Sequence, residues 1–427
     1  MHAQLVACGG QGISVRSLGA SRAGEIRIGR FLRNDAVSVA EMASAAAKRT
    51  AARVTGGHIL AIQDTTVLTS EGGGGQYLHA MIAVDADDDT LYGLVHAIGL
   101  DRSSGKRGSR HLRALSDKES GRWLDCAEKA GTVLGRAERI TIIGDRESDI
   151  FGLYAARPAN ADILVRARQD RRLEHQGMLF AKLDGLDVAG ESTMTLPARP
   201  GIAARDIRLA FRYSPVAILR PGYHRKKDGP DGRFLILYAV DVREIDPTSK
   251  TPIHWRLITS HEVATIEDAK AMVGLYQRRW QIEQLFRTLK TQGFDLEGIE
   301  LADNPARQRL SMAALIAAVS IQQLVHGRDG PTPGRPARPA TDIIDEDEIE
   351  LAELFNDSVE GQTQKQKNPH PRGTLAYLAW VCARLGGWTG YYGKPGPKVM
   401  LKGFLHFQNA TATAKLLSNA YKEIRDV

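Results

Sequence analysis

Two aspartates each end a short apolar run that is typical of a buried strand. Asp64 ends HILAIQD and is followed by two threonines, and Asp145 ends RITIIGD. A carboxylate at the point where a buried strand emerges is held rigidly by the sheet, while the edge admits a substrate. Aspartates at strand ends also commonly cap the next helix or begin a turn. Taken singly, each aspartate fits either interpretation.

A third carboxylate, Glu283, lies in the helical pattern LYQRRWQIEQLFRTLK. At about 100° per residue, one sector about 80° wide holds Glu283 together with Tyr276, Arg279, Arg287 and Lys290. The adjacent sector is apolar and is expected to face the core, and it holds Leu275, Ile282, Leu285, Phe286 and Leu289. A solvent-exposed helix with i,i+4 ion pairs around Glu283, worth roughly a few tenths of a kcal/mol each, fits the same periodicity. Periodicity alone therefore leaves a structural and a functional helix equally open.

The segments around these carboxylates predict a mixed α/β fold. Residues 37–54 are rich in alanine and basic residues and predict a helix. Strand-like runs follow, and their spacing predicts an antiparallel meander that opens a mixed sheet; they lie at 58–68, 77–84 and 91–100. The next predicted elements are a helix at 116–136 and strands at 139–145 and 161–168.

The pattern changes between residues 169 and 253. RDIRLAFRY alternates apolar and polar residues, which predicts a strand with one buried face. The basic turn HRKKDGPDG joins it to a second strand, RFLILYAVDV. We interpret this region as an all-β insertion, after which HWRLITS returns to the core sheet and helices follow at 266–291 and 304–325.

Composition narrows the class of protein. A length of 427 residues predicts two or three domains, and a formal charge of +7 mildly favours a polyanionic partner. Three widely spaced cysteines exclude a disulfide framework and a zinc ribbon and favour a reducing compartment. The start does not resemble a signal peptide, and no apolar run approaches the ~20 residues that span a bilayer. We therefore expect a cytoplasmic protein without a membrane partner.

The three carboxylates lie in motifs that resemble one family. Tyr276, Arg279, Glu283 and Lys290 are separated by two, three and six residues, and this spacing resembles the Tyr-Arg-Glu-Lys signature of bacterial DDE transposases of the insertion-sequence family four. AIQDTT resembles that family's first-aspartate motif, and GDRESDI resembles its second. The motifs occur in the family's order with a β-rich insertion before the third, and the similarity runs from about Arg22 through LAWVCARLGGW.

The resemblance implies an RNase H-like catalytic core, formed by residues 56–168 and 254–300, in which Asp64, Asp145 and Glu283 are the catalytic residues. These carboxylates would hold Mg²⁺, for which Mn²⁺ can substitute, and oxygen donors without His or Cys fit Mg²⁺ better than zinc. Two such ions would activate a water or 3′-OH and stabilise the leaving oxygen. The implied activity is that of a polynucleotidyl transferase, which cuts and rejoins DNA at the ends of a mobile element.

The resemblance also implies contacts with double-stranded DNA, both element ends and target. The implied DNA-binding residues are Tyr276, Arg279, Lys290, Arg287, Arg166, Trp255 and Arg30. Trp255 would stack on a base flipped out of the duplex, or would otherwise be a core tryptophan. Arg287 would bind a phosphate or pair with Glu283. Arg168, Arg171 and Arg172 would extend this surface or be ordinary surface charges.

The remaining regions follow from the same comparison. Members of the family begin with a helical module that recognises the terminal repeats, so residues 1–55 are expected to be an apparently truncated remnant of it. Residues 169–253 are the insertion, and residues 301–427 are a helical region that would form a homodimer in the DNA complex. Two alternative functions stay open: a truncated inhibitor that acts through mixed dimers, and an RNase H-like nuclease that does not transpose.

Overall fold

The computed structural model describes residues 4–5, 15–19, 21–69, 75–101, 121–175, 177–196, 204–222, 233–247, 252–290, 294–296 and 303–425. The predicted turn HRKKDGPDG and the first residues of the helix predicted at 116–136 lie outside these ranges. The chain forms two compact units. Unit 1 contains Met1–Val54, Thr65–Gly105 and Gln281–Val427, and unit 2 contains Thr55–Asp64 and Lys106–Trp280.

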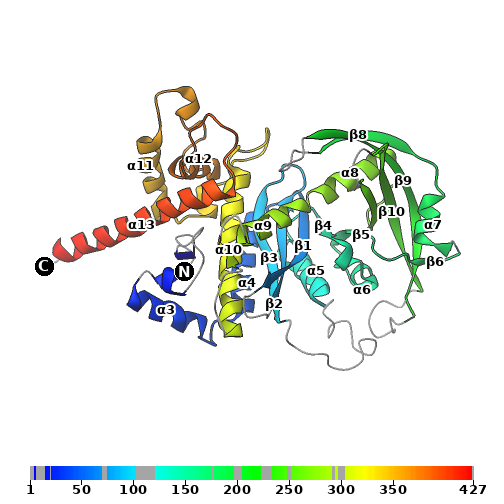
Figure 1. The fold of residues 1–427 in the computed structure, drawn as a ribbon, viewed down its shortest axis with the longest axis horizontal. Helices are drawn as coiled ribbons and strands as arrows, with labels where there is room; N and C mark the ends of the chain where they lie inside the picture. The colour runs from blue at the N-terminus through cyan, green and yellow to red at the C-terminus, as the bar shows by residue number, and fades with distance from the viewer. Residues whose placement is uncertain are drawn as a thin grey trace. The chain divides into compact units, whose positions relative to one another are not determined.

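Unit 2 is built on one mixed sheet (Figure 1). Its strand order is β1-β4-β5-β11-β10-β9-β6-β7, and β8 pairs with β9. The first three strands are parallel, whereas β5, β11, β10 and β9 pair antiparallel. The strands are β1 (His58–Thr69, of which residues 58–64 belong to this unit), β4 (Arg139–Gly144), β5 (Ala161–Arg166), β6 (Arg172–Leu173), β7 (Gly177–Met178), β8 (Gly190–Leu196), β9 (Arg205–Leu219), β10 (Phe234–Ile245) and β11 (His254–Thr259).

The parallel strands are buried on both faces, as their continuous apolar runs require. In β4 every residue after Arg139 is buried, and in β1 the residues from Ile59 to Gln63 are buried as well. Helix α5 (Gly121–Val133) packs on β4 and α6 (Phe151–Ala155) packs on α5. Helix α8 (Ile266–Gln277) packs on β5 and β9. The predicted strands at 139–145 and 161–168, and the return of HWRLITS to the sheet, are confirmed.

The insertion differs from the all-β region that the sequence predicts, because it contains the short helix α7 (Leu179–Asp184). Leu179 and Leu183 are buried four residues apart, which is the spacing of one helical face and not of a strand. The alternation in RDIRLAFRY is confirmed, since Ile207, Leu209 and Phe211 are all buried. Strands β9 and β10 continue the sheet that carries β5 and β11, so this region extends the core sheet of unit 2.

Unit 1 combines a strand pair with helices. Strand β2 (Gly75–Asp85) is antiparallel to β3 (Leu91–Asp101), in the order β3-β2-β1 with Thr65–Thr69 of β1 in this unit. The described α-helices of this unit, besides α9 (Trp280–Lys290), are α2 (Val15–Gly19), α3 (Arg22–Leu32), α4 (Val39–Arg53), α10 (Asn304–Gly327), α11 (Ile349–Val359), α12 (Leu375–Leu385) and α13 (Pro397–Arg425). Helices α4 and α10 pack on β3, and α10 also contacts α12 and α13.

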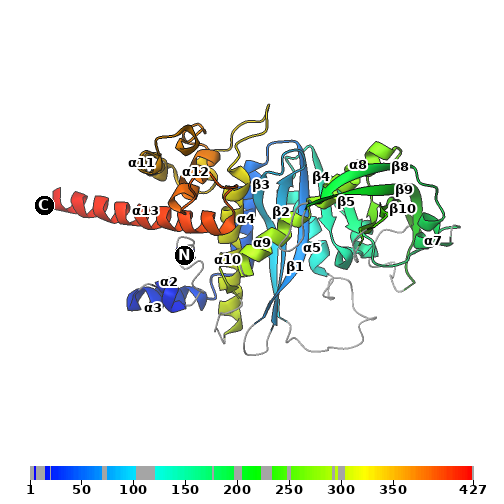
Figure 2. The same ribbon diagram turned by 45° about the horizontal axis from the view of Figure 1, so that its top comes forward.

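Two helices of unit 1 differ in how far they are covered. Among the described residues α10 alone is long and apolar enough to cross a membrane, but 72% of its apolar window is buried inside the structure. Helix α13 packs through Met400, Phe404 and Phe407 in its first half. Figures 1 and 2 both show the rest of α13 extending away from α10 and α12, and Leu416 and Leu417 are exposed there.

The prediction of a single helix at 266–291 is wrong. The chain forms two helices there, α8 and α9 (Trp280–Lys290), which are separated by a turn at Arg278 and Arg279. In this turn the N–H groups of Arg278 and Arg279 donate to the carbonyl oxygens of Leu275 and Tyr276, three residues earlier. Bonds over three residues tighten the chain compared with an α-helix. The helical sector drawn through all five polar residues therefore does not run unbroken from Tyr276 to Lys290.

A buried histidine links strands of unit 2. The ring of His261 is 3% exposed, and its Nε2 lies 2.8 Å from the Thr141 hydroxyl, which is also 2.7 Å from Nε2 of His58. The pKa of His261 is lowered to about 4, chiefly by burial; Asp162 opposes this change, and Arg139 and His58 add to it. The imidazole of the folded chain is therefore neutral between about pH 4 and 6.5, where the unfolded chain binds a proton.

This difference predicts how stability changes with acid. The folded pKa lies below the unfolded value near 6.5, so His261 favours folding fully above about pH 6.5, and this contribution is lost as the pH falls towards about 4. The loss amounts to at most about 3 kcal/mol. Urea unfolding between pH 7 and 4 should show a shallower decline for His261→Asn than for the wild type. The matched change His175→Asn, at a side chain that is 86% exposed, should leave the decline as it is, and an equal effect of both changes would contradict the assignment.

Candidate active site

Three of the predicted site residues lie just beyond the paired stretches of β1, β4 and β5. The last pair of β1 with β4 is Ile62 with Ile143, so Asp64 and Asp145 each lie two residues beyond it. The last pair of β4 with β5 is Gly144 with Val165, so Asp145 and Arg166 each lie one residue beyond it. Neighbouring strands lie about 4.8 Å apart, and in-register residues of parallel strands point to the same face. If the register continues, the two carboxylates and the guanidinium would share one face. Asp145 and Arg166 lie where β4 and β5 end, but the expectation that Asp64 ends its strand is wrong, because β1 continues to Thr69.

Asp145 begins a very tight turn. It has extended backbone angles and caps the 3₁₀ turn η2 (Arg146–Ser148), where its side chain accepts a hydrogen bond of 2.8 Å from the N–H of Glu147. The hydroxyl of Ser148 donates to the carbonyl oxygen of Asp145 at 2.6 Å. A Cβ on Gly144 would come within 2.2 Å of that hydroxyl oxygen, so only glycine fits before Asp145. Asp145 therefore caps the 3₁₀ turn and also directly follows the last residue of β4.

Asp64 forms an ion pair with another predicted site residue. Its Oδ2 accepts a hydrogen bond of 3.0 Å from Nη1 of Arg279, and the side chains are 16% and 18% exposed. Arg279 lies in the turn between α8 and α9, and its guanidinium carbon lies 5.9 Å from the ring centroid of Tyr276. The structure thus brings together two residues that lie far apart in the chain, on a carboxylate that is mostly shielded from solvent.

Tyr276 lies at the centre of this group. The residue is 5% exposed, and burial raises the pKa of its hydroxyl, an effect that Asp145 reinforces and that Arg279 and Arg166 oppose. Its ring meets the half-buried Trp255 edge-on, with centroids 5.5 Å apart. The phenol therefore interacts with a carboxylate, two guanidinium groups and an indole within unit 2.

The side chain of Arg166 is fixed by a hydrogen bond to strand β11. Its Nη2 donates a hydrogen bond of 3.0 Å to the carbonyl oxygen of His254, the residue before Trp255. Burial lowers the pKa of Arg166, and the nearby cations Arg146 and Arg279 act in the same direction. A partly buried cation that lies among other cations is a favourable place for an anion such as a phosphate.

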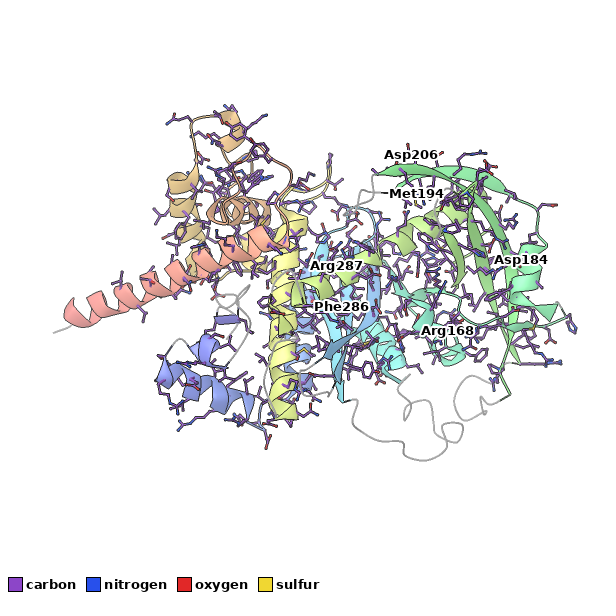
Figure 3. The ribbon with its side chains drawn as sticks, in the orientation of Figure 1. Arg168, Asp184, Met194, Asp206, Phe286 and Arg287 are labelled. Carbon is purple, nitrogen blue, oxygen red and sulfur yellow. The ribbon has the colours of Figure 1, made fainter. Side chains whose placement is uncertain are left out.

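The third predicted carboxylate belongs to unit 1, since Glu283 lies on the part of α9 after Trp280. On this helix alone, Glu283, Arg287 and Lys290 fall within a sector of about 60°, with Arg287 exposed and the other two half-buried. The predicted apolar face is confirmed, because Ile282, Leu285, Phe286 and Leu289 are buried. Figure 3 labels the adjacent residues Phe286 and Arg287 on α9. The convergence of Glu283 with the two aspartates stays a prediction.

Unit 1 also contains the predicted DNA-binding residue Arg30 and a separate cluster of three carboxylates. Arg30 is exposed on α3. Asp345, Asp347 and Glu348 have oxygens within 4.8 Å of one another, but Lys415 lies 3.1 Å from Asp347 and 3.0 Å from Glu348. This lysine neutralises part of the acidic run, so these carboxylates form an ion-pair network of their own, separate from the predicted triad.

Sequence reasoning missed Asp149, which stands four residues after Asp145 in GDRESDI. Its side chain is 2% exposed, and one carboxylate oxygen accepts hydrogen bonds from the N–H groups of Arg168 at 2.7 Å and Gln169 at 2.8 Å. The other carboxylate oxygen accepts a hydrogen bond of 2.9 Å from Nε of the Arg171 guanidinium. Asp149 therefore ties the turn that follows Asp145 to the loop that follows β5. The signal that could have identified Asp149 in the sequence was its position within the motif GDRESDI.

Arg171 corrects one expectation. The sequence suggested a DNA-contacting or ordinary surface charge, but the residue is 5% exposed and pairs with the buried Asp149. Its guanidinium carbon also lies 5.4 Å from the ring centroid of Tyr154, whose hydroxyl donates to Asp149 at 2.7 Å. Arg168 and Arg172 are exposed.

Comparison with known protein families adds one finding. A family model described as a transposase DDE domain matches residues 59–319. The match covers more than half of the chain, begins in β1 and ends in α10. It includes Asp64, Asp145 and Glu283, together with the insertion between the second and third of them.

The Asp149 network predicts a large loss of stability on substitution. Asp149→Ala would leave the buried guanidinium of Arg171 without its carboxylate, which costs about 3–5 kcal/mol for a buried pair. The control is Glu147→Ala in the same turn, because Glu147 is 55% exposed and its pair with Arg122 spans 3.3 Å; this change should cost about 1 kcal/mol or less. Urea unfolding measures both, and similar losses for the two variants would show that Asp149 does not hold the loops.

Proposed function

The chain belongs to the family of the transposase DDE domain, and we propose that it cuts and rejoins DNA at the ends of a mobile element. The observation that carries this proposal is the parallel register of β1 with β4, because Asp64 and Asp145 each lie two residues beyond its last pair, Ile62 with Ile143. Both residues and Glu283 lie inside the family match. Within the family we assign the chain to insertion-sequence family four, because Tyr276, Arg279, Glu283 and Lys290 have its signature spacing.

An RNase H-like core is part of this proposal. Unit 1 has the strand order β3-β2-β1 and unit 2 continues from β1 through the parallel strands β4 and β5. An aspartate directly after β4 and another inside β1, two residues beyond its pairing with β4, suit this architecture, because the sheet would fix both while the end of β4 admits the substrate. The insertion after β5 returns through β11, antiparallel to β5, in keeping with the proposed two-part core.

The side chains fit Mg²⁺, with Mn²⁺ as a substitute. Asp64 and Asp145 would share one face and Glu283 would complete the set, and all three offer the oxygen donors that Mg²⁺ prefers. Divalent ions bound there would activate the attacking water or 3′-OH and stabilise the leaving oxygen. The remaining work, which is to bind and orient the DNA, belongs to the side chains around the aspartates.

The cations of the site would neutralise the phosphate at the bond to be cut. Arg279 and Arg166 present planar guanidinium groups, which can bind two phosphate oxygens at once, whereas Lys290 acts as a point charge. A neutralised phosphate repels an approaching nucleophile less. Tyr276 would hydrogen-bond a phosphate oxygen through its hydroxyl, whose raised pKa keeps the proton on it. Arg287, which is exposed, and Arg30 would bind phosphates further along the duplex.

Trp255 would hold a base displaced from the duplex. The indole is half-buried and packs on Tyr276 along one edge. An aromatic side chain fixed in this way can stack on an extruded base and lower the free energy of distorted DNA. Because Tyr276 contacts both this indole and Arg279, one residue would connect base stacking to phosphate binding.

We also propose that the protein acts as a homodimer on DNA through the helical region at 301–427. Within this region α12 is covered, since each residue from Leu375 to Ala383 is buried. Residues 412–417 of α13 are exposed instead, including Leu416 and Leu417. A nuclease that only cuts DNA is the second candidate, and the joining of the cut 3′ end to a target duplex distinguishes the two functions.

Removing any one carboxylate of the proposed triad should abolish metal-dependent cleavage. Asp64→Asn, Asp145→Asn and Glu283→Gln keep the shape of each side chain but remove its charge. Nicking of a pre-bound end substrate with Mg²⁺ or Mn²⁺ should fall to background in all three, while thermal unfolding stays close to that of the wild type. Glu267→Gln, at an exposed carboxylate in the first turn of α8, should cut normally. Retained nicking in Glu283→Gln would remove this residue from the catalytic set.

Trp255→Ala should affect a later step more than the first nick. Loss of stacking on the extruded base should cost about 1–3 kcal/mol in the step that distorts the DNA. Single-turnover rates of nicking and of strand transfer would measure this difference, and Trp255→Phe should restore most of the later rate. If both rates fall equally in Trp255→Ala, the tryptophan is a packing residue and not a base-stacking one.

A further inference from the structure

We propose that Arg279 and a divalent ion compete for Asp64, and that a DNA phosphate ends the competition by drawing Arg279 away. This inference concerns the regulation of the site and rests on the proposed role of Asp64 as a metal ligand. Its physical basis is the ion pair between Nη1 of Arg279 and Oδ2 of Asp64, 3.0 Å apart. Metal binding and DNA binding would then be coupled through one arginine.

The surroundings of the pair strengthen it. Both side chains are more than four-fifths shielded from solvent, so the attraction between the charges is screened less than in an exposed pair. A metal ion approaching Asp64 would meet a guanidinium already in contact with the carboxylate. Two cations at contact distance repel each other, so occupancy of Asp64 by one disfavours the other.

The position of Arg279 allows its side chain to move without the helices. Its N–H donates to the carbonyl oxygen of Tyr276 at 3.1 Å, which anchors the backbone in the turn between α8 and α9. The long side chain leaves this anchor and crosses near the Tyr276 ring to reach Asp64. Rotation about its side-chain bonds would redirect the guanidinium while the turn stays in place.

A phosphate is a suitable replacement partner for Arg279. A guanidinium can bind a phosphate with two parallel hydrogen bonds, and the phosphates of a duplex bring a high density of negative charge to it. Arg166 and Tyr276 interact electrostatically with Arg279, so a phosphate near Arg279 would also be attracted by Arg166. Duplex DNA would therefore free Asp64 at the place where the bond is to be cut.

Coupling of this kind is reciprocal. If DNA raises the affinity of the protein for the ion, the ion raises its affinity for DNA by the same factor, typically 5- to 150-fold. The competition would keep the ion weakly bound until DNA arrives. A site arranged in this way is protected from unproductive metal binding away from its substrate.

The test is Mn²⁺ binding to the whole chain, measured by electron paramagnetic resonance without DNA. Arg279→Gln should bind Mn²⁺ at least about fivefold more tightly than the wild type. The matched control is Arg278→Gln, because Arg278 is the adjacent residue and carries the same charge, but its Nη1 donates to the carbonyl oxygen of Gly274 at 3.0 Å. This control should bind Mn²⁺ like the wild type.

A second arm adds a short duplex of random sequence. The duplex should tighten Mn²⁺ binding by the wild type more than by Arg279→Gln, in which no competitor is left to remove. DNA phosphates can bind Mn²⁺ themselves, so the difference between the two proteins is the deciding quantity. Equal gains in both, or equal DNA-free affinities of wild type and Arg279→Gln, would overturn the proposal.

The remaining variants separate this proposal from the proposed function. Asp64→Asn should lose the Mn²⁺ site, and if it does not, the metal-binding role of Asp64 fails and the proposed catalytic site fails with it. If Asp64→Asn loses the site but Arg279→Gln behaves like the wild type, only the competition is wrong. Should Arg279→Gln not fold, Arg279→Lys replaces it. This variant keeps the charge but loses the planar fork, so it should gain less Mn²⁺ affinity from the duplex than the wild type, and an equal gain would overturn the proposal.

Discussion

The register of three parallel strands is the constraint on which the rest of the site depends. Side chains of parallel strands alternate between faces, so a shift of one residue between β1 and β4 would send Asp64 and Asp145 to opposite faces. The apolar residues of both strands prevent that shift, because they are buried on both sides. Arg166 and Asp145 each follow the last pair of β4 with β5, Gly144 with Val165. Core packing therefore determines which charges come close together beyond these paired stretches.

Bringing charges together at a buried edge requires compensation, and the compensating groups are those that would bind DNA. Asp64 has Arg279, and Tyr276 keeps its proton between two arginines and a carboxylate. Burial by itself disfavours the charged forms of these groups, so each cation makes its neighbouring carboxylate less costly to bury. The arginines therefore stabilise the buried charges, besides their proposed role in binding phosphate. The contact of Arg279 with Asp64 is one such stabilising pair.

The sequence predicted most of the strands and the end of β4 before Asp145, because apolar runs with a polar end are a local signal. It wrongly placed Asp64 at a strand end, because β1 continues through the polar threonines to Thr69. It also predicted the buried face of α9 from the spacing of Ile282, Leu285 and Leu289. The break between α8 and α9 escaped prediction, since the amphipathic pattern continues across a turn that only two hydrogen bonds define. The sequence also assigned Arg171 to the surface, because nothing in the sequence identifies Asp149 as its buried partner.

Asp149 shows how a motif can combine two kinds of residue. Asp145 and Asp149 stand in one short segment, yet the first is half-buried at the strand end and the second is buried under two loops. The second carboxylate accepts hydrogen bonds from the loop that follows Arg166, and so it connects the turn after β4 to the loop after β5. A substitution there would loosen both segments without replacing Asp145 or Arg166. The segment GDRESDI thus holds the proposed catalytic carboxylate at one position and a structural carboxylate at the other.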